Sequence, residues 1–394
     1  MSILKNSKIT TAFVSGGFRT MRFIRAQGRS VPGIIDDLHR VRRFLFLEYG
    51  TALGTNVHAT PVFEALKRAV PDAVTMVACS RMGFEVFRHN PFIDYLIETP
   101  WPPTSPLHAV RSLRSHLKTT GFDPEIVITS KGNERRSISM LALVAGTAIR
   151  FGYTLAPELY DVVLSYDAKQ SLIGNHLNVI ERLGYQKESV EPRVFFTRKD
   201  LEKTEWLLRE NGIAKSTTRI VCVTQTSRTQ RRGWPVAQFI SVLNHASSKH
   251  NADIVFAGTS SEAQEIESLR AQVPGATVSL AGQTTIQTMA ALLASSDLVL
   301  ALDSGNMHIG RSVGVPMVIL APAWAPSIEW LPLGFDQFHV LLGDLDPCSP
   351  PGCEIIQMDQ TEVTEAVDRL LTTYPPSDSA RRQRAERNVS SILR

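Results

Sequence analysis

Short apolar runs alternate with longer amphipathic segments along most of the 394-residue chain, and the alternation starts again after the midpoint. Each apolar run is too short for a helix and is apolar on both faces, as strands buried in a parallel sheet are. The runs predicted as strands occupy residues 44–50, 73–80, 93–99, 124–130, 219–226, 252–258, 276–282, 298–302 and 316–322, and the segment 135–153 is predicted to hold a helix followed by one more short strand. Because helical spacing separates them, the pattern predicts an α/β fold with two doubly wound, Rossmann-like domains.

A polar stretch at residues 187–200 separates the two sets of strands and is the predicted linker. The predicted units are a basic N-terminal extension, two domains and a basic polar tail, at residues 1–43, 44–190, 191–372 and 373–394. The amphipathic helix at 361–372 closes the second domain and is a candidate to cross back to the first. In open sheets of this kind ligands bind outside the carboxyl ends of the strands, so a cleft between the domains is the expected site.

Residues 1–43 carry nine Lys or Arg residues against two Asp residues, a net charge of +7. Apolar side chains, including Phe18, Met21 and Phe23, are interleaved with the arginines. A basic segment of this kind favours an anionic membrane surface as its partner. An arm that packs on its own domain or on a partner subunit is an equally good interpretation. Nucleic acid is not an expected partner, because no aromatic platform or nucleic-acid motif accompanies the charge.

The cysteines and the hydropathy of the chain indicate a cytoplasmic protein, with the basic arm as a means of peripheral attachment to the inner face of the plasma membrane. The four cysteines are too few and too scattered for a disulfide framework. Cys348 and Cys353 lie close together but lack further ligands nearby, so no metal site is expected. No apolar run reaches the roughly 18 residues of a membrane span, and the N-terminus lacks the apolar core of a secretory signal.

The segment DSGNMH at residues 303–308 stands between the apolar run 298–302 and a short helical stretch of small residues. It therefore lies at the carboxyl end of a strand and the amino end of a helix. Free backbone N–H groups and the helix dipole favour an anion there, typically a phosphate. An ordinary Asp or Ser N-cap beside a satisfied histidine explains the same residues. No Walker loop is present and no GxGxxG follows the first strand, so a phosphate site has to use this turn.

Several motifs occur in the order found in the heptosyltransferases of glycosyltransferase family 9, and from about residue 44 to residue 372 the chain resembles that family. They are ALGTNVHATPVFEALKRAVPDA, RSISMLALVAGTAIRFGY, TQTSRTQRRGWPVAQF, FAGTSSEAQEI and LAGQTTIQTMAALLASSDLVLALDSGNMHIGRSVGVP. The last of these resembles the family's most specific segment. The resemblance implies the GT-B fold, in which two Rossmann-like domains face each other across a cleft.

The resemblance also implies a site for an ADP-heptose-like donor in the second half of the chain. The implied donor-binding residues are Thr224, Thr226, Ser227, Arg232, Glu262, Asp303, Ser304, Gly305, Asn306, Met307 and His308. Backbone N–H groups of residues 305–308 would hold the pyrophosphate, and Asp303 would accept hydrogen bonds from sugar hydroxyls. Arg232 stands where the family usually has Lys, and Glu262 would accept from the ribose. A surface Arg, a helix N-terminal Glu and a capping Asp are the rival interpretations.

One position departs from the family pattern. The family has Gly-Asp near its start, with the aspartate as general base, whereas here Gly54 is followed by Thr55. A threonine hydroxyl has a pKa far above neutral and cannot serve as a base. Glu48, at the end of the first predicted strand, and His58, one helical turn after Thr55 and with a pKa suited to neutral pH, are the candidate replacements. Packing or capping for His58, and an ion pair for Glu48, are the alternatives.

The resemblance implies a glycosyltransferase that is inverting and metal-independent, as the family is, and no cofactor is expected. Its predicted donor is a nucleotide-activated sugar such as ADP-heptose, and its acceptor a lipopolysaccharide core or another cell-envelope glycan or glycolipid. The alternative is a non-catalytic nucleotide-sugar-binding or scaffold protein that has lost the general base at Thr55.

Overall fold

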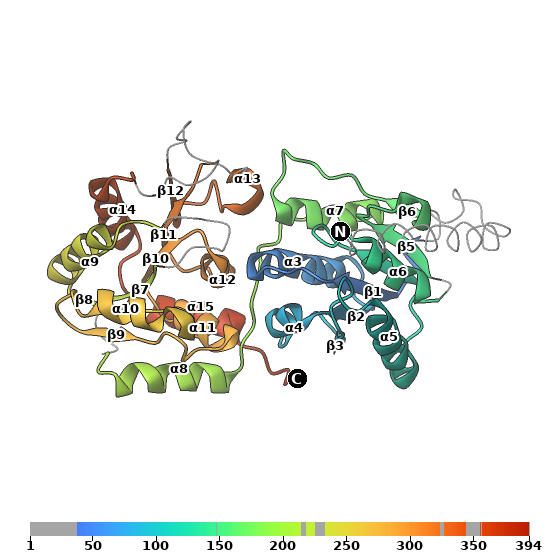
Figure 1. The fold of residues 1–394 in the computed structure, drawn as a ribbon, viewed down its shortest axis with the longest axis horizontal. Coiled ribbons are helices and arrows are strands. Elements are labelled where there is room, and N and C mark those ends of the chain that lie inside the picture. Colours follow the sequence, from blue (N-terminus) through green and yellow to red (C-terminus); the bar gives the residue numbers. More distant parts are fainter. Residues whose placement is uncertain are drawn as a thin grey trace, which may run out of the picture.

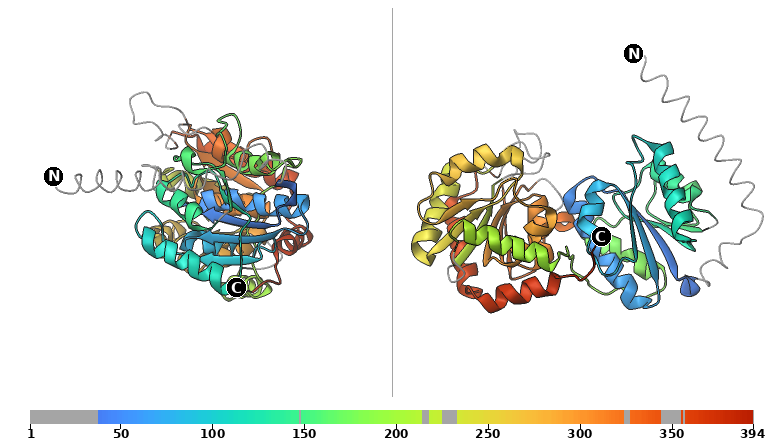
Figure 2. Two further views of the ribbon diagram at one scale, coloured as in Figure 1. Left: turned by 90° about the vertical axis from the view of Figure 1, so that its right-hand side faces the viewer. Right: turned by 90° about the horizontal axis from the view of Figure 1, so that it is seen from below.

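The computed structural model describes residues 38–146, 148–213, 218–224, 233–323, 327–343, 355 and 357–393. Within them the chain forms two α/β domains that stand side by side (Figures 1 and 2). Each domain has a six-stranded parallel sheet with helices on both faces. The prediction of two doubly wound domains is confirmed.

The N-terminal sheet has the strand order β3-β2-β1-β4-β5-β6. Its strands are β1 Arg43–Glu48, β2 Val74–Cys79, β3 Tyr95–Glu98, β4 Ile126–Thr129, β5 Ile149–Gly152 and β6 Val162–Val163. The helices are α3 Leu53–Ala69, α4 Arg81–Phe87, α5 Pro106–Thr120, α6 Arg136–Val144 and α7 Leu172–Arg182, with short 3-10 turns at Leu38–Arg40 and Pro157–Leu159. Successive β1 side chains point to opposite faces: Phe44 packs in the core on the α3 side, and Leu45 in the core on the α5 side.

The C-terminal sheet repeats this topology, with the order β12-β11-β10-β7-β8-β9. Its strands are β7 Thr218–Val223, β8 Ala252–Phe256, β9 Thr277–Ser279, β10 Leu298–Leu302, β11 Met317–Ala321 and β12 Phe338–Leu342. The helices are α8 Arg198–Glu210, α9 Val236–His250, α10 Ala263–Arg270, α11 Ile286–Ala294, α12 Gly305–Val313, α13 Ser327–Trp330, α14 Gln360–Thr373 and α15 Asp378–Asn388, with a 3-10 turn at Ser260–Glu262. In both sheets the direction in which successive strands are added reverses beside the first strand of the domain. The reversal lies between β1 and β4 in the N-terminal sheet and between β7 and β10 in the C-terminal sheet.

The N-terminal domain begins earlier than the expected boundary at residue 44. Leu38 and Val41 are buried in its core, and the backbone N–H groups of Arg42 and Arg43 both donate to Glu125. Residues 1–37, which carry most of the predicted basic arm, lie outside the described residues. The six residues from 38 to 43 therefore belong to the folded domain.

The chain crosses back through its tail rather than through the expected helix. Helix α14 packs on α9 and stays within the C-terminal domain. The tail forms α15, and beyond it Val389 pairs with Phe196 of the linker region. The Ile392 carbonyl then lies 2.7 Å from Nδ1 of His89 in the N-terminal domain, so the chain end returns to that domain (Figure 1).

Helix α3 continues through Pro61. A proline lacks the N–H that would bond to the carbonyl four residues earlier, which here belongs to Val57. The Thr60 hydroxyl donates to that Val57 carbonyl instead, at 2.8 Å. Local side-chain chemistry thus satisfies the carbonyl that Pro61 leaves without its usual donor.

The amino ends of α3 and α12 meet between the two domains (Figure 1). A Cβ added to Gly54 would lie 2.4 Å from Cδ2 of His308, and one added to Gly305 would lie 2.7 Å from Cδ2 of Leu53. Only glycine fits at either position without a shift, and both glycines therefore permit the close approach. No helix among the described residues is long and apolar enough to cross a membrane.

Candidate functional site

The polar turns predicted as functional lie where the strand order of each sheet reverses. In the C-terminal sheet β7 and β10 are neighbours, and Thr224 and Asp303 directly follow them. In the N-terminal sheet β1 and β4 are neighbours, and Glu48 and Ser130 stand at their carboxyl ends. Such reversal points are where open α/β sheets bind ligands.

The turn before α12 presents helix N–H groups and an unsatisfied hydroxyl. Ser304 is the N-cap residue, in extended conformation, and its side chain makes no capping bond. Its Oγ is buried and has no hydrogen-bond partner among the described residues. A buried hydroxyl without a partner is unfavourable unless a water or a ligand supplies one. The Met307 side chain is fully buried in the core, so at that position only the backbone is available to a ligand.

Of the remaining expected donor-binding residues, Thr224 and Glu262 are among the described residues. Thr224 follows β7 and is half-buried, whereas Thr226, Ser227 and Arg232 lie outside the described residues. Glu262 follows β8 in a capping box, where its Oε2 accepts from the Thr259 N–H at 2.6 Å. This is the capping geometry named above as a rival interpretation, and it leaves Oε1 as the carboxylate oxygen not committed to that bond.

His58 and His308 face each other across the domain boundary. Nε2 of His58 lies 3.0 Å from Nδ1 of His308, and the Trp330 ring of α13 stacks on His58 with centroids 5.7 Å apart. Burial is the largest cause of a pKa for His58 well below its ordinary value, and the nearby His308 and Arg311 lower this pKa further. The expectation that His58 has a pKa suited to neutral pH is therefore wrong. Burial and Arg311 likewise lower the pKa of His308 to about 3, so both rings are neutral and share a single hydrogen bond.

Glu48 is buried at the end of β1 and its carboxyl group is fully engaged. The Ser130 hydroxyl donates to Oε1 and Asn133 Nδ2 donates to Oε2 at 3.0 Å. Burial raises the pKa of Glu48 to about 8, although both hydrogen bonds oppose the shift. At neutral pH this side chain is mostly a protonated acid, which cannot accept a proton. Its contacts fix the loop after β4 to the end of β1.

The loop after β4 also holds a carboxylate that the sequence analysis missed. A Cβ added to Gly132 would lie 3.0 Å from the Thr55 methyl group, so this loop covers the position of the missing aspartate. Glu134 accepts from the Gly132 N–H at 2.9 Å and pairs with Lys131 at 2.5 Å. The only signal in the sequence was its place just after a predicted strand.

Glu134 lines a cavity of about 510 Å³ at the carboxyl edge of the N-terminal sheet. Glu48 is not among the residues that line it. Tyr166 closes one side, and burial together with the nearby Glu329 carboxylate raises its pKa to about 12. Since Glu329 belongs to α13, the cavity lies next to the C-terminal domain.

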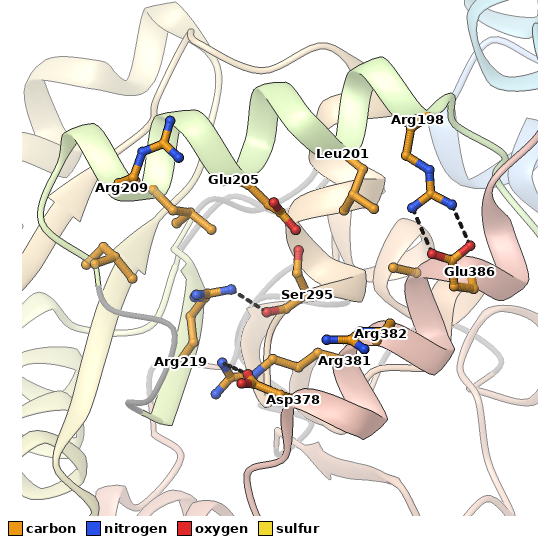
Figure 3. A pocket seen from close by; sticks show the side chains of 13 residues that line it. Arg198, Leu201, Glu205, Arg209, Arg219, Ser295, Asp378, Arg381, Arg382 and Glu386 are labelled. Carbon is orange, nitrogen blue, oxygen red and sulfur yellow. Dashed lines mark hydrogen bonds and ion pairs between the residues drawn. The ribbon is translucent and has the colours of Figure 1, made fainter.

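Two further cavities bear on where a substrate can enter. One, of about 450 Å³, lies between α7 and the segment around α13, where Arg311 forms a two-bond ion pair with Glu191 of the linker at 2.9 and 3.1 Å. The other, of about 400 Å³, lies between α8 and α15 and is lined by several arginines (Figure 3). None of the expected site residues lines this last cavity, so the inter-domain region remains the candidate site.

A family model and a curated relative both point to one glycosyltransferase family. The model of glycosyltransferase family 9 (heptosyltransferase) matches residues 110–329. The lipopolysaccharide core heptosyltransferase OpsX of Haemophilus influenzae is 22% identical over 280 residues, which cover 68% of this chain and 76% of that protein.

Solved structures share the fold at low sequence identity. The family 9 glycosyl transferase of Veillonella parvula has a TM-score of 0.76 and 20% identity, covering 84% of this chain and 98% of that one. The ADP-heptose lps heptosyltransferase II of E. coli has a TM-score of 0.67 and 15% identity, covering 84% and 99%. The fold is therefore GT-B. Because the family match is more than half of this chain and extends across both domains, the chain belongs to glycosyltransferase family 9, the heptosyltransferase family.

Proposed function

We propose that this glycosyltransferase transfers heptose from ADP-heptose to a lipopolysaccharide-core or related cell-envelope glycan acceptor. The observation that carries the proposal is the α12 turn, where helix N–H groups and the unpartnered, buried Ser304 hydroxyl stand beside β7 and β10. Helix amino ends at such reversal points suit a pyrophosphate. A heptosyltransferase of E. coli with this fold, WaaC, is known with ADP and with ADP-2-deoxy-2-fluoro heptose.

In this proposal the donor lies along the carboxyl edge of the C-terminal sheet. The N–H groups of residues 305–307 and the Arg232 guanidinium hold the pyrophosphate, because an Arg fork can bind phosphate through two hydrogen bonds. The His308 N–H, which the sequence analysis included, already donates to the Ser304 carbonyl at 3.4 Å. Asp303 accepts from the heptose hydroxyls, and the hydroxyls of Thr224, Thr226, Ser227 and Ser304 add polar contacts. Glu262 accepts from the ribose through the oxygen that is not committed to Thr259.

Transfer would proceed by inversion and without a metal. The acceptor hydroxyl attacks the anomeric carbon from the face opposite the pyrophosphate, a base takes its proton, and ADP leaves with the electron pair. Positive charge on Arg232 and at the amino end of α12 then stabilises the leaving group in place of a metal ion.

We propose Glu134 as the general base that replaces the aspartate missing at Thr55. Glu134 lines the cavity at the N-terminal sheet and is joined through Gly132 to the Thr55 position. Glu48 is mostly protonated at neutral pH. His58 is fully buried, with Nε2 directed at His308. Of these candidates, Glu134 is the one that lines a cavity able to receive an acceptor.

The basic arm is the part of the chain that we propose brings the enzyme close to its acceptor. Six of the nine basic residues of segment 1–43 lie before residue 38, interleaved with apolar side chains. We propose that this part of the arm holds the protein at an anionic membrane surface, where a glycolipid acceptor would be found. An arm that packs on its own domain or on another copy of the chain is the alternative.

The direct test of function is release of ADP from ADP-heptose, measured with and without extracts that contain acceptor glycolipids. The proposal expects release that depends on the acceptor. Donor binding without release, together with release by Thr55→Asp, would instead identify a non-catalytic nucleotide-sugar-binding protein. Absence of both donor binding and release would contradict the proposed function altogether.

A further inference from the structure

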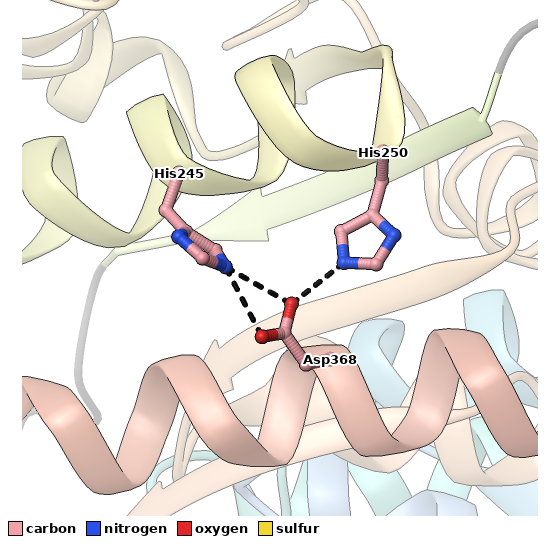
Figure 4. Close-up of side chains that lie close together, drawn as sticks. All are labelled: His245, His250 and Asp368. Carbon is pink, nitrogen blue, oxygen red and sulfur yellow. Dashed lines mark hydrogen bonds and ion pairs between the residues drawn. The ribbon is translucent and has the colours of Figure 1, made fainter.

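Two histidines and an aspartate converge on one point between α9 and α14 (Figure 4). Nε2 of His245 lies 3.0 Å from Oδ1 of Asp368, and Nε2 of His250 lies 2.6 Å from the same oxygen. The three possible ligand atoms all lie within 4.8 Å of one another, and all three side chains are half-buried. They face one another from two helices, with no backbone between them (Figure 4).

The ligand set suits a borderline transition metal. Two imidazole nitrogens and one carboxylate oxygen are a common ligand set for Zn²⁺, with a fourth position left for water. Ligand atoms around one zinc ion stand about 3.3 Å apart at ordinary bond lengths. Nε2 of His245 would therefore move from 3.0 Å to about 3.3 Å from Oδ1, and Nε2 of His250 from 2.6 Å to about 3.3 Å. Partial exposure leaves the ion a path from solvent.

Lys249 does not compete for the shared oxygen. Its ammonium lies 2.8 Å from Oδ2 of Asp368, the other carboxylate oxygen. It can keep this contact while Oδ1 binds the metal, and it would then orient the carboxylate as second-layer hydrogen bonds do in metal sites. The ion would compete only with the hydrogen bonds between the two histidines and Asp368, two from His245 and one from His250.

The cluster is separate from the candidate donor site. His250 is the last residue of α9, and β8 begins two residues later at Ala252. The cluster therefore lies toward the amino edge of the C-terminal sheet, whereas the donor turn at 303–308 lies at the carboxyl edge.

We propose that His245, His250 and Asp368 bind a Zn²⁺-class divalent metal ion with an open fourth position. The ion would tie α9 to α14, two helices that already pack against each other. This site is structural and plays no part in the metal-independent transfer proposed above.

The test uses full-length protein without an affinity tag, stripped of metal by a chelator and titrated with Co²⁺ and Zn²⁺ near pH 7.5. We expect one ion per chain at this site, a visible Co²⁺ spectrum typical of nitrogen and oxygen ligands, and a Zn²⁺-dependent rise in melting temperature. His245→Ala and the isosteric Asp368→Asn should each weaken binding more than about tenfold. His116→Ala, a half-buried helix histidine of the N-terminal domain, should leave binding unchanged.

Circular dichroism establishes that each variant is folded, and the isosteric Asp368→Asn protects the test against a misfolded alanine variant. No binding by the wild type, or equal binding by wild type, His245→Ala and Asp368→Asn, would overturn the proposal. A Co²⁺ spectrum dominated by thiolate charge transfer that persists in both variants would place the metal at cysteines instead and equally overturn it.

Discussion

At the scale of single residues, burial decides what a carboxyl group at a strand end can do. Glu48 and Glu134 both stand at the carboxyl edge of the N-terminal sheet. Glu48 is 2% exposed and its pKa is raised to about 8. Glu134 lines an open cavity and pairs with Lys131. The residue that looks better placed in the sequence is thus the poorer base in the structure.

Glu48 should make the stability of the protein fall as the pH rises. Its folded-state pKa of about 8 exceeds the ordinary value of 4.5, so its contribution is complete below pH 4.5 and is lost as the pH rises through 8. Glu48→Gln keeps the group neutral and removes this dependence. Urea unfolding at about pH 5, 7 and 9 should show the wild type losing a few kcal/mol relative to the variant. Parallel pH profiles would contradict the raised pKa.

Replacing Glu134 should slow transfer far more than replacing Glu48. Loss of a general base typically lowers the rate about 10²–10⁴-fold, so we expect that loss for Glu134→Gln. Glu48→Gln serves as the matched control, because at neutral pH it replaces a protonated acid with an amide of the same shape. Turnover of ADP-heptose with saturating acceptor gives the rates. If Glu48→Gln is the slow variant and Glu134→Gln is not, the base assignment is reversed.

At the scale of elements, the amino ends of α3 and α12 form the main contact between the domains. They meet through glycines at 54 and 305, which leave no room for a side chain. The neutral His58–His308 pair fills the next layer, with Trp330 against it. The proposed pyrophosphate site therefore adjoins the helix on which the family's missing aspartate would stand.

Gly54→Ala should loosen this contact. The added methyl group would meet Cδ2 of His308 at 2.4 Å, and overpacking of this kind usually costs about 1–3 kcal/mol. We expect a lower urea midpoint and faster hydrogen exchange in both helices. Gly174→Ala is the control, since its methyl group would meet mainly the flexible side chain of Gln170. Equal stability of the two variants would show that α3 and α12 do not pack as described.

Two deletions separate the roles of the N-terminal segment. Removing residues 1–37 should abolish binding to anionic liposomes. It should leave the melting temperature unchanged, because Leu38 is the first residue that the structure places in the buried core. Removing residues 1–43 should also destabilise the fold by about 2 kcal/mol or more, because Leu38 and Val41 leave the core. Liposome sedimentation and thermal unfolding measure the two effects. Undiminished liposome binding by the shorter deletion would rule out the membrane role.

Most elements could be predicted from the sequence because hydrophobic periodicity is local. The alternation gave the strands up to β11 except for the short β6, while α7, α13 and β12 were not assigned, although α7 has readable amphipathic spacing. Only part of the candidate site could be predicted from the sequence. Its polar turns are formed by residues that are neighbours in the chain, whereas its side-chain contacts join residues far apart in the chain. His58 meets His308 across 250 positions, and His245 meets Asp368 across 123. A pattern of neighbouring residues in the sequence cannot indicate contacts between residues so far apart in the chain.

At the scale of the whole molecule, two similar sheets present their carboxyl-edge turns to the region between them. The C-terminal sheet supplies the proposed donor turn, and the N-terminal sheet supplies the cavity lined by Glu134. The chain crosses between the domains twice, through the linker held by Arg311 and Glu191 and through the tail that reaches His89. Both connections therefore make contacts that link the two domains.

The most direct test of the central claim is calorimetric titration of wild type, Arg232→Ala and Asp303→Ala with both ADP and ADP-heptose. Loss of a charge-assisted contact costs about 1.5–3 kcal/mol, roughly ten- to a hundredfold in affinity. We expect Arg232→Ala to weaken both ligands by this factor, because it removes a pyrophosphate contact. Asp303→Ala should weaken ADP-heptose alone, because it removes a sugar contact. Wild-type affinities for both ligands in both variants, with normal melting curves, would contradict a donor site at this turn.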